Sequence, residues 1–269
     1  MNECLNVILT KDVSCDTFWL HDILRFPSKK SQKCESRNLL SDFKLVAKLW
    51  AEFIGSTFLV MAAISPVILF NRVLDSGIGI AVLADAVGVA WVLFALISVF
   101  GPVSGAHFNP AVSLSFSYSR SLPWKILPYY VFVQIAGGIV GTLATHLMFY
   151  HQVDSLVTLS SVTRNGGCFP AEAFGTFVLV FTIQALVYQK SDKLPMVVSL
   201  LVGGQLISTS STMFANPQVT IARMLTYSAA GIRPVDGLIF IVVQFSSAIV
   251  ATITWQYIFE KNKIPTPDE

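Results

Sequence analysis

The ten residues Ala51-Glu-Phe-Ile-Gly-Ser-Thr-Phe-Leu-Val60 return in the second half of the chain as Ala171-Glu-Ala-Phe-Gly-Thr-Phe-Val-Leu-Val180. A later landmark repeats in the same order, because Asn109-Pro-Ala-Val-Ser is matched by Asn216-Pro-Gln-Val-Thr. The chain therefore consists of two related halves, each of which carries one Ala-Glu segment followed by one Asn-Pro motif.

The composition points to lipid as the main solvent of this chain. Apolar residues make up 54% of the 269 residues and charged residues only 13%, and the mean hydropathy is +0.65. The charged fraction is about half that of an ordinary soluble domain. Apolar runs separated by breaker residues predict six transmembrane helices over 46–70, 78–100, 124–149, 169–188, 194–213 and 235–259. We therefore expect an all-α membrane protein.

Each half contains three of these spans and ends with a further matched landmark, Val131-Phe-Val-Gln-Ile in the first half and Ile241-Val-Val-Gln-Phe in the second. Three is an odd number, so the second half crosses the membrane in the opposite sense to the first. The apolar segments after Asn109 and Asn216 are too short to cross a bilayer core of about 30 Å. Because both begin with Asn-Pro, and proline suits the first position of a helix, we predict two re-entrant half-helices.

Basic residues predict the orientation of the chain in its membrane. They are dense in the N-terminal tail and recur between later spans, at Arg120 and Lys125, Lys190 and Lys193, and Lys261 and Lys263. By the positive-inside rule both termini are expected in the cytoplasm. The expected location is the plasma membrane, and the sequence alone does not distinguish it from an internal membrane. The predicted parts are a cytosolic tail (1–45), a first half-repeat (46–150), an extracytoplasmic connection (151–168), a second half-repeat (169–259) and a C-terminal tail (260–269).

Several functional classes are disfavoured. A formal net charge of +2 without a basic face gives no reason to expect a nucleic-acid partner. Cys4, Cys15, Cys34 and Cys168 show no zinc-type spacing, so we expect unpaired thiols and no metal. The alternative is a metal site built from Cys4, Cys15 and His21. The chain shows no nucleophile–base pair, metal-ligand set or phosphate loop, so we expect no catalytic residue and no enzyme.

An inverted repeat has a direct consequence for permeation. The two half-helices approach from opposite membrane faces, so their N-terminal ends meet near the midplane, each with roughly half a positive charge. A cation is repelled there, whereas a neutral polar molecule can accept hydrogen bonds. Asn109 and Asn216 stand at the helix starts and are expected to point carboxamide N–H groups at the solute.

Glu52 and Glu172 occupy equivalent positions of the repeat. A carboxylate inside a span usually marks a function or a structural partner. We favour a structural role, in which each carboxylate accepts hydrogen bonds from N–H groups of a pore loop. A proton relay is the alternative.

The run Ser104-Gly-Ala-His-Phe-Asn-Pro-Ala-Val-Ser113 resembles the signature of the major intrinsic protein family, the aquaporins and aquaglyceroporins. With the repeated landmarks, the resemblance covers about residues 46–259. It implies the aquaporin fold, a homotetramer with one pore in each subunit, passive conduction and no cofactor. It also implies proton exclusion at two motifs, here Asn109, Pro110 and Ala111, and Asn216, Pro217 and Gln218. By the same resemblance, His107 packs and anchors the loop.

The second motif departs from the family pattern Asn-Pro-Ala-Arg, because Gln218 and Val219 follow Pro217. By the resemblance, the selectivity filter falls on four positions, which a count from the two Asn residues without gaps places at Val89, Gly204, Met213 and Val219. This set lacks the aromatic, His and Arg of a water-selective member, so we expect a wider, more apolar filter. Such a constriction penalises bare ions and admits larger uncharged solutes, such as glycerol, urea and metalloid acids including arsenous acid. The run from Asn216 to Arg223 also resembles a microbial branch of the family in which such solutes are suspected.

Arg223 lies four residues beyond Val219, on about the same face of the half-helix. Helical side chains lean toward the N-terminus, so we predict that Arg223 reaches back and restores part of the missing positive charge. The alternative is that it pairs with a loop carbonyl or with another subunit.

Three rival functions stay open at this point. A water-selective aquaporin is the first. An ion-coupled secondary transporter also uses inverted repeats, but its ionisable groups within the spans would have to come from Glu52, Asp85, Glu172 and His146. The third is a junctional membrane protein with a closed pore, against which the intact Asn-Pro pair argues.

Overall fold

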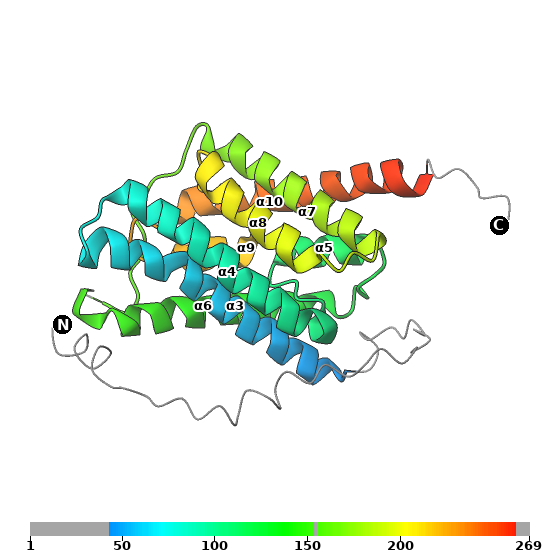
Figure 1. Ribbon diagram of the computed structural model, residues 1–269, viewed down its shortest axis with the longest axis horizontal. Helices are drawn as coiled ribbons and strands as arrows, with labels where there is room; N and C mark the ends of the chain where they lie inside the picture. The colour runs from blue at the N-terminus through cyan, green and yellow to red at the C-terminus, as the bar shows by residue number, and fades with distance from the viewer. Residues whose placement is uncertain (1–42, 153–154, 262–269) are drawn as a thin grey trace, which may run out of the picture. The chain divides into compact units, whose positions relative to one another are not determined.

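The computed structural model describes residues 43–152 and 155–261, and these residues form helices and connecting loops (Figure 1). The first half holds α3 (Leu45–Ile68), α4 (Ile78–Ser104), the short α5 (Pro110–Tyr118) and α6 (Leu127–Met148). The second half repeats this order as α7 (Cys168–Tyr188), α8 (Leu194–Ser208), the short α9 (Pro217–Arg223) and α10 (Pro234–Gln256). π-Helical turns prolong α3 to Val73 and α10 to Lys261, and a 3-10 turn covers Tyr150–Gln152.

The helices agree with the predicted spans to within a few residues, except at the end of α8. Five helices are long and apolar enough to cross a membrane, whereas α8 has only 15 residues. The span predicted over 194–213 is therefore too long. The chain turns extended at Thr209, whose hydroxyl accepts a hydrogen bond from the Met213 N–H at 3.0 Å, and residues 209–216 lead irregularly into α9.

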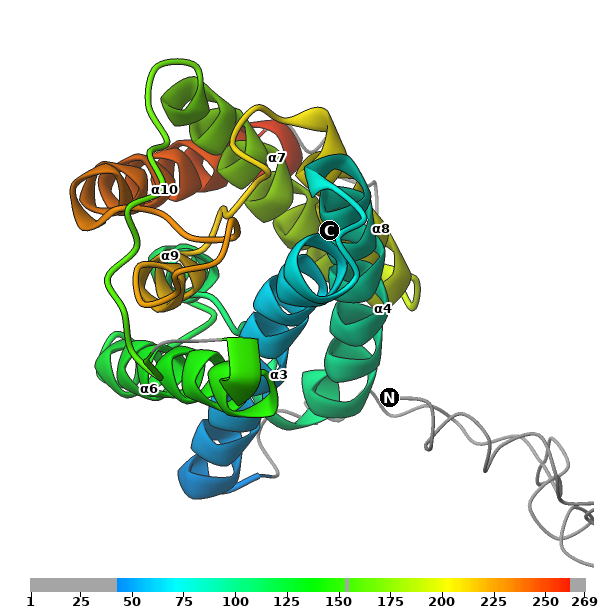
Figure 2. The same cartoon turned by 90° about the vertical axis from the view of Figure 1, so that its left-hand side faces the viewer.

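The contacts between helices show the inverted repeat. In the first half α3 packs against α4 and α6, and in the second α7 packs against α8 and α10. Each half-helix also crosses to the other half, because α5 packs on α10 and α9 packs on α6. Figure 2, which looks along the helices from one end, shows α9 beside α6 and α10, with the remaining long helices around them. The six spans and two half-helices thus form the predicted fold.

Glycines permit the closest helix contacts. A Cβ atom at Gly137 or Gly141 would overlap the backbone oxygen of Phe53 or Thr57 on α3. Gly203 lies against Ala86 and Ala90 of α4 in the same way. These close approaches are typical of helix packing in membranes, where small residues let backbones meet.

Outward-facing side chains are consistent with a lipid environment. Trp91, Phe132 and Phe174 are each more than 70% exposed, although they lie within helices that also have buried faces. Such exposed aromatic surface is unfavourable in water and suits the apolar core of a bilayer.

Some predictions concern residues outside the described ranges. They include Cys4, Cys15 and Cys34, the alternative metal site with His21, and most of the N-terminal tail. Cys168 is described, and its free thiol lies 3.5 Å from the carbonyl oxygen of Ser210. The limits assigned to the tails and half-repeats stay predictions.

Candidate transport channel

The two Asn-Pro motifs meet at the centre of the bundle. Asn109 and Asn216 are the N-caps of α5 and α9, and both have extended backbone conformations. The Asn109 Nδ2 donates to the Ala215 carbonyl at 2.8 Å, and the Asn216 Nδ2 donates to the Phe108 carbonyl at 2.8 Å. Each carboxamide nitrogen carries two N–H groups, so one of each remains for the channel that both asparagines line.

Each side-chain oxygen of these asparagines completes a cap. The Asn109 Oδ1 accepts from the Ala111 N–H at 2.9 Å, and the Asn216 Oδ1 accepts from the Gln218 N–H at 3.1 Å. Pro110 and Pro217 follow at the first helical position, where the missing N–H costs nothing. The side chains are thus fixed in rotation with their nitrogens toward the centre.

Glu52 supports the loop that leads into α5. Its buried carboxylate accepts from the N–H groups of His107 at 3.0 Å and Phe108 at 2.7 Å. The Ser104 hydroxyl and the Gln134 amide donate to it at 2.6 and 2.8 Å. Phe108 lies in the left-handed region at φ 47°, so these bonds hold a backbone conformation that is unfavourable for a bulky residue.

Glu172 supports the loop that leads into α9 in the same manner. It accepts from the N–H groups of Phe214 and Ala215, both at 2.8 Å, and from the Gln244 amide at 2.7 Å. Gln134 and Gln244, the repeated glutamines of the sequence, each bridge their glutamate to a hydroxyl of the half-helix, Ser113 or Thr220, at 3.0 Å. Both glutamates therefore make the loop contacts that a structural role requires.

His107 packs against the first half-helix. One ring nitrogen lies 3.1 Å from the Ser113 hydroxyl, and the ring stacks on Phe116 with centroids 4.7 Å apart. His107 also lines the channel.

Gln218 takes the place of the small Ala111 in the second motif, and its side chain turns away from the channel toward Gly138 of α6. Its Nε2 donates to the Phe108 carbonyl at 3.2 Å, and its Oε1 finds no donor among the described residues. A Cβ at Gly138 would overlap this oxygen, so the glycine makes room for the larger side chain.

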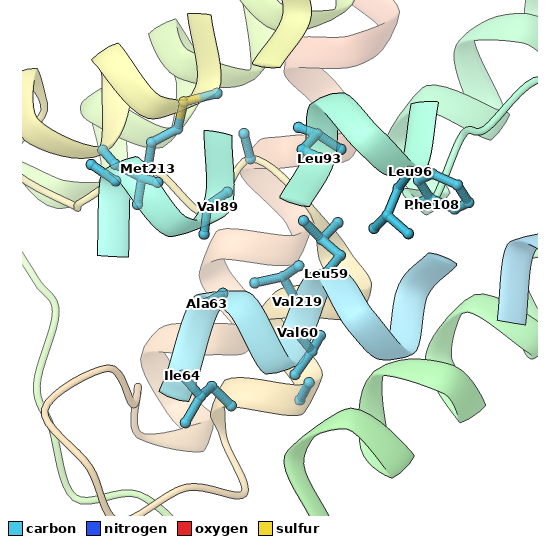
Figure 3. Packing of buried hydrophobic residues seen from close by; sticks show 14 of the residues in the cluster. Leu59, Val60, Ala63, Ile64, Val89, Leu93, Leu96, Phe108, Met213 and Val219 are labelled. Atoms are coloured by element: carbon cyan, nitrogen blue, oxygen red, sulfur yellow. The ribbon is translucent and has the colours of Figure 1, made fainter. Parts of the chain in front are cut away.

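The channel between the half-helices is lined mainly by apolar side chains from α3, α4, α7 and α8. Val89, Met213 and Val219, three of the four predicted filter residues, lie in this lining, and Figure 3 shows them among the buried side chains around Leu59 and Leu93. The aromatic residues of the described lining are His107, Phe116 and Phe214.

The assignment of Gly204 to the filter is wrong. Gly204 is exposed and is absent from the channel lining, which α8 supplies through Leu194, Val198, Val202 and Leu206. These residues recur every fourth position and share one face of the helix, whereas Gly204 lies two positions from Val202 and Leu206, on the opposite face. Counting back without gaps fails because residues 209–216 are irregular. Leu206 is the last of these lining residues, near the C-terminal end of α8, and it is buried.

Arg223 both lines the channel and pairs with the backbone. The residue is 2% exposed, its Nε donates to the Ala230 carbonyl, and its guanidinium lies 4.0 Å from the ring centroid of Phe214. Its Nη2 stands 3.9 Å from the Oδ2 of Asp85 on α4. The loop carbonyl foreseen as the alternative partner is thus present together with the channel position.

Arg164 and Phe214 were not anticipated from the sequence. Arg164, in the connection before α7, donates to the carbonyls of Gly231 and Ser211 at 2.9 and 2.7 Å, and its guanidinium lies 4.8 Å from the Phe214 centroid. Burial lowers the pKa of this guanidinium, and the acidic groups nearby oppose the shift. An arginine stays charged under such conditions. We call Asp85, Arg164, Phe214 and Arg223 the arginine cluster.

A sequence signal for part of this cluster existed. Asp85 and Arg223 are opposite charges within otherwise uncharged segments, and buried charges in a membrane protein are almost always paired.

The described residues contain no group of three or more His, Cys, Asp or Glu side chains that could hold a metal ion. The arrangement therefore offers hydrogen bonds and charge to a passing molecule.

Comparisons with known proteins agree with this geometry. The family model described as "Major intrinsic protein" matches residues 39–214. The "Aquaglyceroporin AqpS" of Rhizobium meliloti is 33% identical over 221 residues, which cover 82% of this chain and 94% of that protein. "Nodulin-26" of Glycine max is 28% identical over 64% of this chain and 62% of its own length. "Aquaporin NIP3-1" of Arabidopsis thaliana is 30% identical, and the match spans only 48% of its length.

Among solved structures, the X-ray structure of the aquaglyceroporin from Plasmodium falciparum superposes with a TM-score of 0.59. The match covers 81% of this chain and 97% of that protein, at 19% sequence identity. At this sequence identity, the match supports the fold alone.

Proposed function

We propose which solutes this chain conducts, starting from the fact that it belongs to the major intrinsic protein family, whose members are channels and not enzymes. They are small uncharged molecules, namely glycerol, urea and metalloid acids such as arsenous acid, together with water. The relative from Rhizobium meliloti bears the name aquaglyceroporin, which supports solutes larger than water.

The observation that carries the proposal is the chemistry of the constriction. Val89, Leu206, Met213 and Val219 are all buried and all line the channel, and no His or Arg stands at any of these positions. Methyl and thioether groups offer nothing that replaces the hydration shell of an ion. They do accommodate the carbon skeleton of a polyol, whose hydroxyls can reach the two asparagines farther along the channel.

Exclusion of ions and protons is assigned to the channel centre and to Arg223. The N-terminal ends of α5 and α9 and the free N–H groups of Asn109 and Asn216 all present positive potential to the same point. Arg223 adds a full charge in the lining. We expect Arg223→Ala to raise proton or cation leak in voltage-clamped cells, and unchanged leak and solute selectivity would contradict this role.

The remaining assignments concern the whole assembly and its membrane. We assign the protein to the plasma membrane, as a homotetramer with a pore in each subunit and both termini in the cytoplasm. Arg120, Lys125, Lys190 and Lys193 lie in loops at the same end of the bundle, which supports this orientation.

Ion-coupled transport is a weaker alternative because three of the four ionisable groups named for it, Glu52, Glu172 and His146, already have hydrogen-bond partners. Glu52 and Glu172 accept three or more hydrogen bonds each. His146 contacts the Leu156 carbonyl at 2.7 Å and the Thr226 hydroxyl at 2.9 Å through its two ring nitrogens. A coupling site needs a group that exchanges its partner during transport.

The test compares water and solute permeability of proteoliposomes by stopped-flow light scattering. A sucrose step reports water, and inward gradients of glycerol, urea and arsenous acid report solutes. We expect rapid re-swelling with solute in the wild type. Val219→Arg is expected to lower glycerol permeability by about tenfold or more while water still passes, and Val219→Thr, of nearly the same size, serves as the matched control. Fast shrinkage in sucrose without solute uptake would instead establish a water-selective channel.

A further inference from the structure

Asp85 is a buried carboxylate that the channel mechanism does not use. It lies on α4 and is 2% exposed, and its Oδ1 has no hydrogen-bond partner among the described residues. Its Oδ2 faces Arg223 at 3.9 Å, beyond hydrogen-bond distance. A buried carboxylate oxygen without a donor is costly, so a group that arrives from outside the chain is the natural partner.

The space in front of Asp85 is a hollow next to the channel, with polar side chains on one side. Asp85, Arg164, Thr212 and Arg223 line it on the polar side, and Val67 and Val82 form part of its apolar wall. Arg223 lines both this hollow and the channel, so a molecule held at Asp85 lies beside the route to Val219.

The two arginines differ in what they have left to donate. Arg164 uses its Nε and both terminal nitrogens on oxygen atoms of residues 211–212, 229 and 231, and so holds the wall of the hollow together. Arg223 uses only its Nε, because neither Nη atom donates a hydrogen bond to any residue of 43–152 or 155–261. The terminal N–H groups of Arg223 are therefore available in the same hollow as the free oxygen of Asp85.

We propose that Asp85 and Arg223 form a docking site for an uncharged molecule with two or more hydroxyl groups. One hydroxyl donates to the Asp85 Oδ1, and an oxygen of the same molecule accepts from an Arg223 Nη. A polyol or a trihydroxy metalloid acid meets both requirements. The inference rests on the proposed function and adds the step that captures the solute before the constriction.

Charge argues for a neutral occupant. Two guanidinium groups and one carboxylate line the hollow, so a cation meets the two arginines, while an anion meets the carboxylate at the point where a donor is needed. A neutral molecule with adjacent donors and acceptors matches both groups, and hydrogen bonds to charged groups are roughly twice as strong as neutral ones.

The experiment measures initial uptake of radiolabelled glycerol into proteoliposomes over a range of concentrations, with osmotic water permeability measured on the same preparations. The variant is Asp85→Asn. Asp75→Asn is the matched control, because Asp75 is exposed in the loop before α4, at the same end of the bundle. We expect Asp85→Asn to raise the half-saturating glycerol concentration about threefold to tenfold, with water permeability and Asp75→Asn near wild type.

Other outcomes overturn the proposal. If glycerol and water permeability of Asp85→Asn fall in parallel, or if neither changes, Asp85 only packs or binds water. If Asp85→Asn does not fold, the wild type alone decides, because a docking site requires uptake that saturates and uptake that stays proportional to concentration contradicts it. A wild type that conducts water but no glycerol would overturn the proposed function itself, and the docking site with it.

Discussion

The two halves of the channel make the same contact with different chemistry. In the first half, the residue two positions before the motif asparagine is His107, and the residue seven positions after it is Phe116, on which His107 stacks. In the second half the corresponding residues are Phe214 and Arg223, and the guanidinium again lies over the ring at 4.0 Å. The same packing position thus holds a histidine on a phenylalanine in the first half and an arginine on a phenylalanine in the second.

This difference separates the residues that stabilise the pore from the residues that select its solutes. Glu52 and Glu172 bind their loops alike, and each motif asparagine donates to the backbone carbonyl that precedes the other one. The centre therefore depends on contacts that both halves share. The arginine cluster has no equivalent in the first half, where His107 and Phe116 take the positions of Phe214 and Arg223, whereas Val219 has a counterpart in Val112, which also lines the channel. We therefore expect changes at the centre to affect stability and changes in the second half to affect selectivity.

The largest effect is expected at the shared supports. Glu52→Ala and Glu172→Ala should each lower the free energy of unfolding by about 3–5 kcal/mol, because two backbone N–H groups and a glutamine amide lose their buried acceptor. Thermal unfolding in detergent measures this, and Glu→Gln at each position, which keeps one acceptor oxygen, should lose less. A large loss at one glutamate with none at the other would break the equivalence of the halves.

Next in size is the constriction. Leu206→Trp should reduce glycerol permeability by about tenfold or more, because the larger ring enters the channel lining. Gly204→Trp is the matched control on the same helix and should leave the permeability near wild type, since its side chain points to the opposite face. Equal losses of glycerol permeability in both variants would mean that Gly204 also faces the channel.

The sequence predicted the centre well and the second half less well, for physical reasons. Repeated Ala-Glu, Asn-Pro and Gln landmarks carry their own register, so the helices and their inverted order follow from them. Gly204 was misassigned because its position depends on the irregular residues 209–216, whose path no helical period describes. Arg164 was missed because its partners are mostly backbone carbonyls far away in the chain, at Ser211, Ala229 and Gly231.

A smaller effect is expected from the coupling of Asp85 and Arg223. A double-mutant cycle with Asp85→Asn and Arg223→Phe, the latter copying the first half, should give a coupling free energy of about 1 kcal/mol. Each single change leaves one buried charge without its counter-charge at 3.9 Å, and the double change removes both. Unfolding free energies that simply add would mean that the two groups do not sense each other.

The smallest effect is expected from Gln218→Ala, which gives the second motif the Asn-Pro-Ala sequence of the first. The change removes the 3.2 Å bond to the Phe108 carbonyl, but that oxygen keeps its bond from Asn216, and the buried Oε1 that lacks a donor disappears as well. The loss of this bond and the removal of the unpaired oxygen nearly cancel, so the free energy of unfolding should change by no more than about 1 kcal/mol.

The ratio of glycerol to water permeability in proteoliposomes should stay within about twofold of wild type, because Gln218 is buried and absent from the channel lining. A change of that ratio well beyond twofold would mean that the third residue of the motif, and not only the residues after it, sets the difference between the two halves.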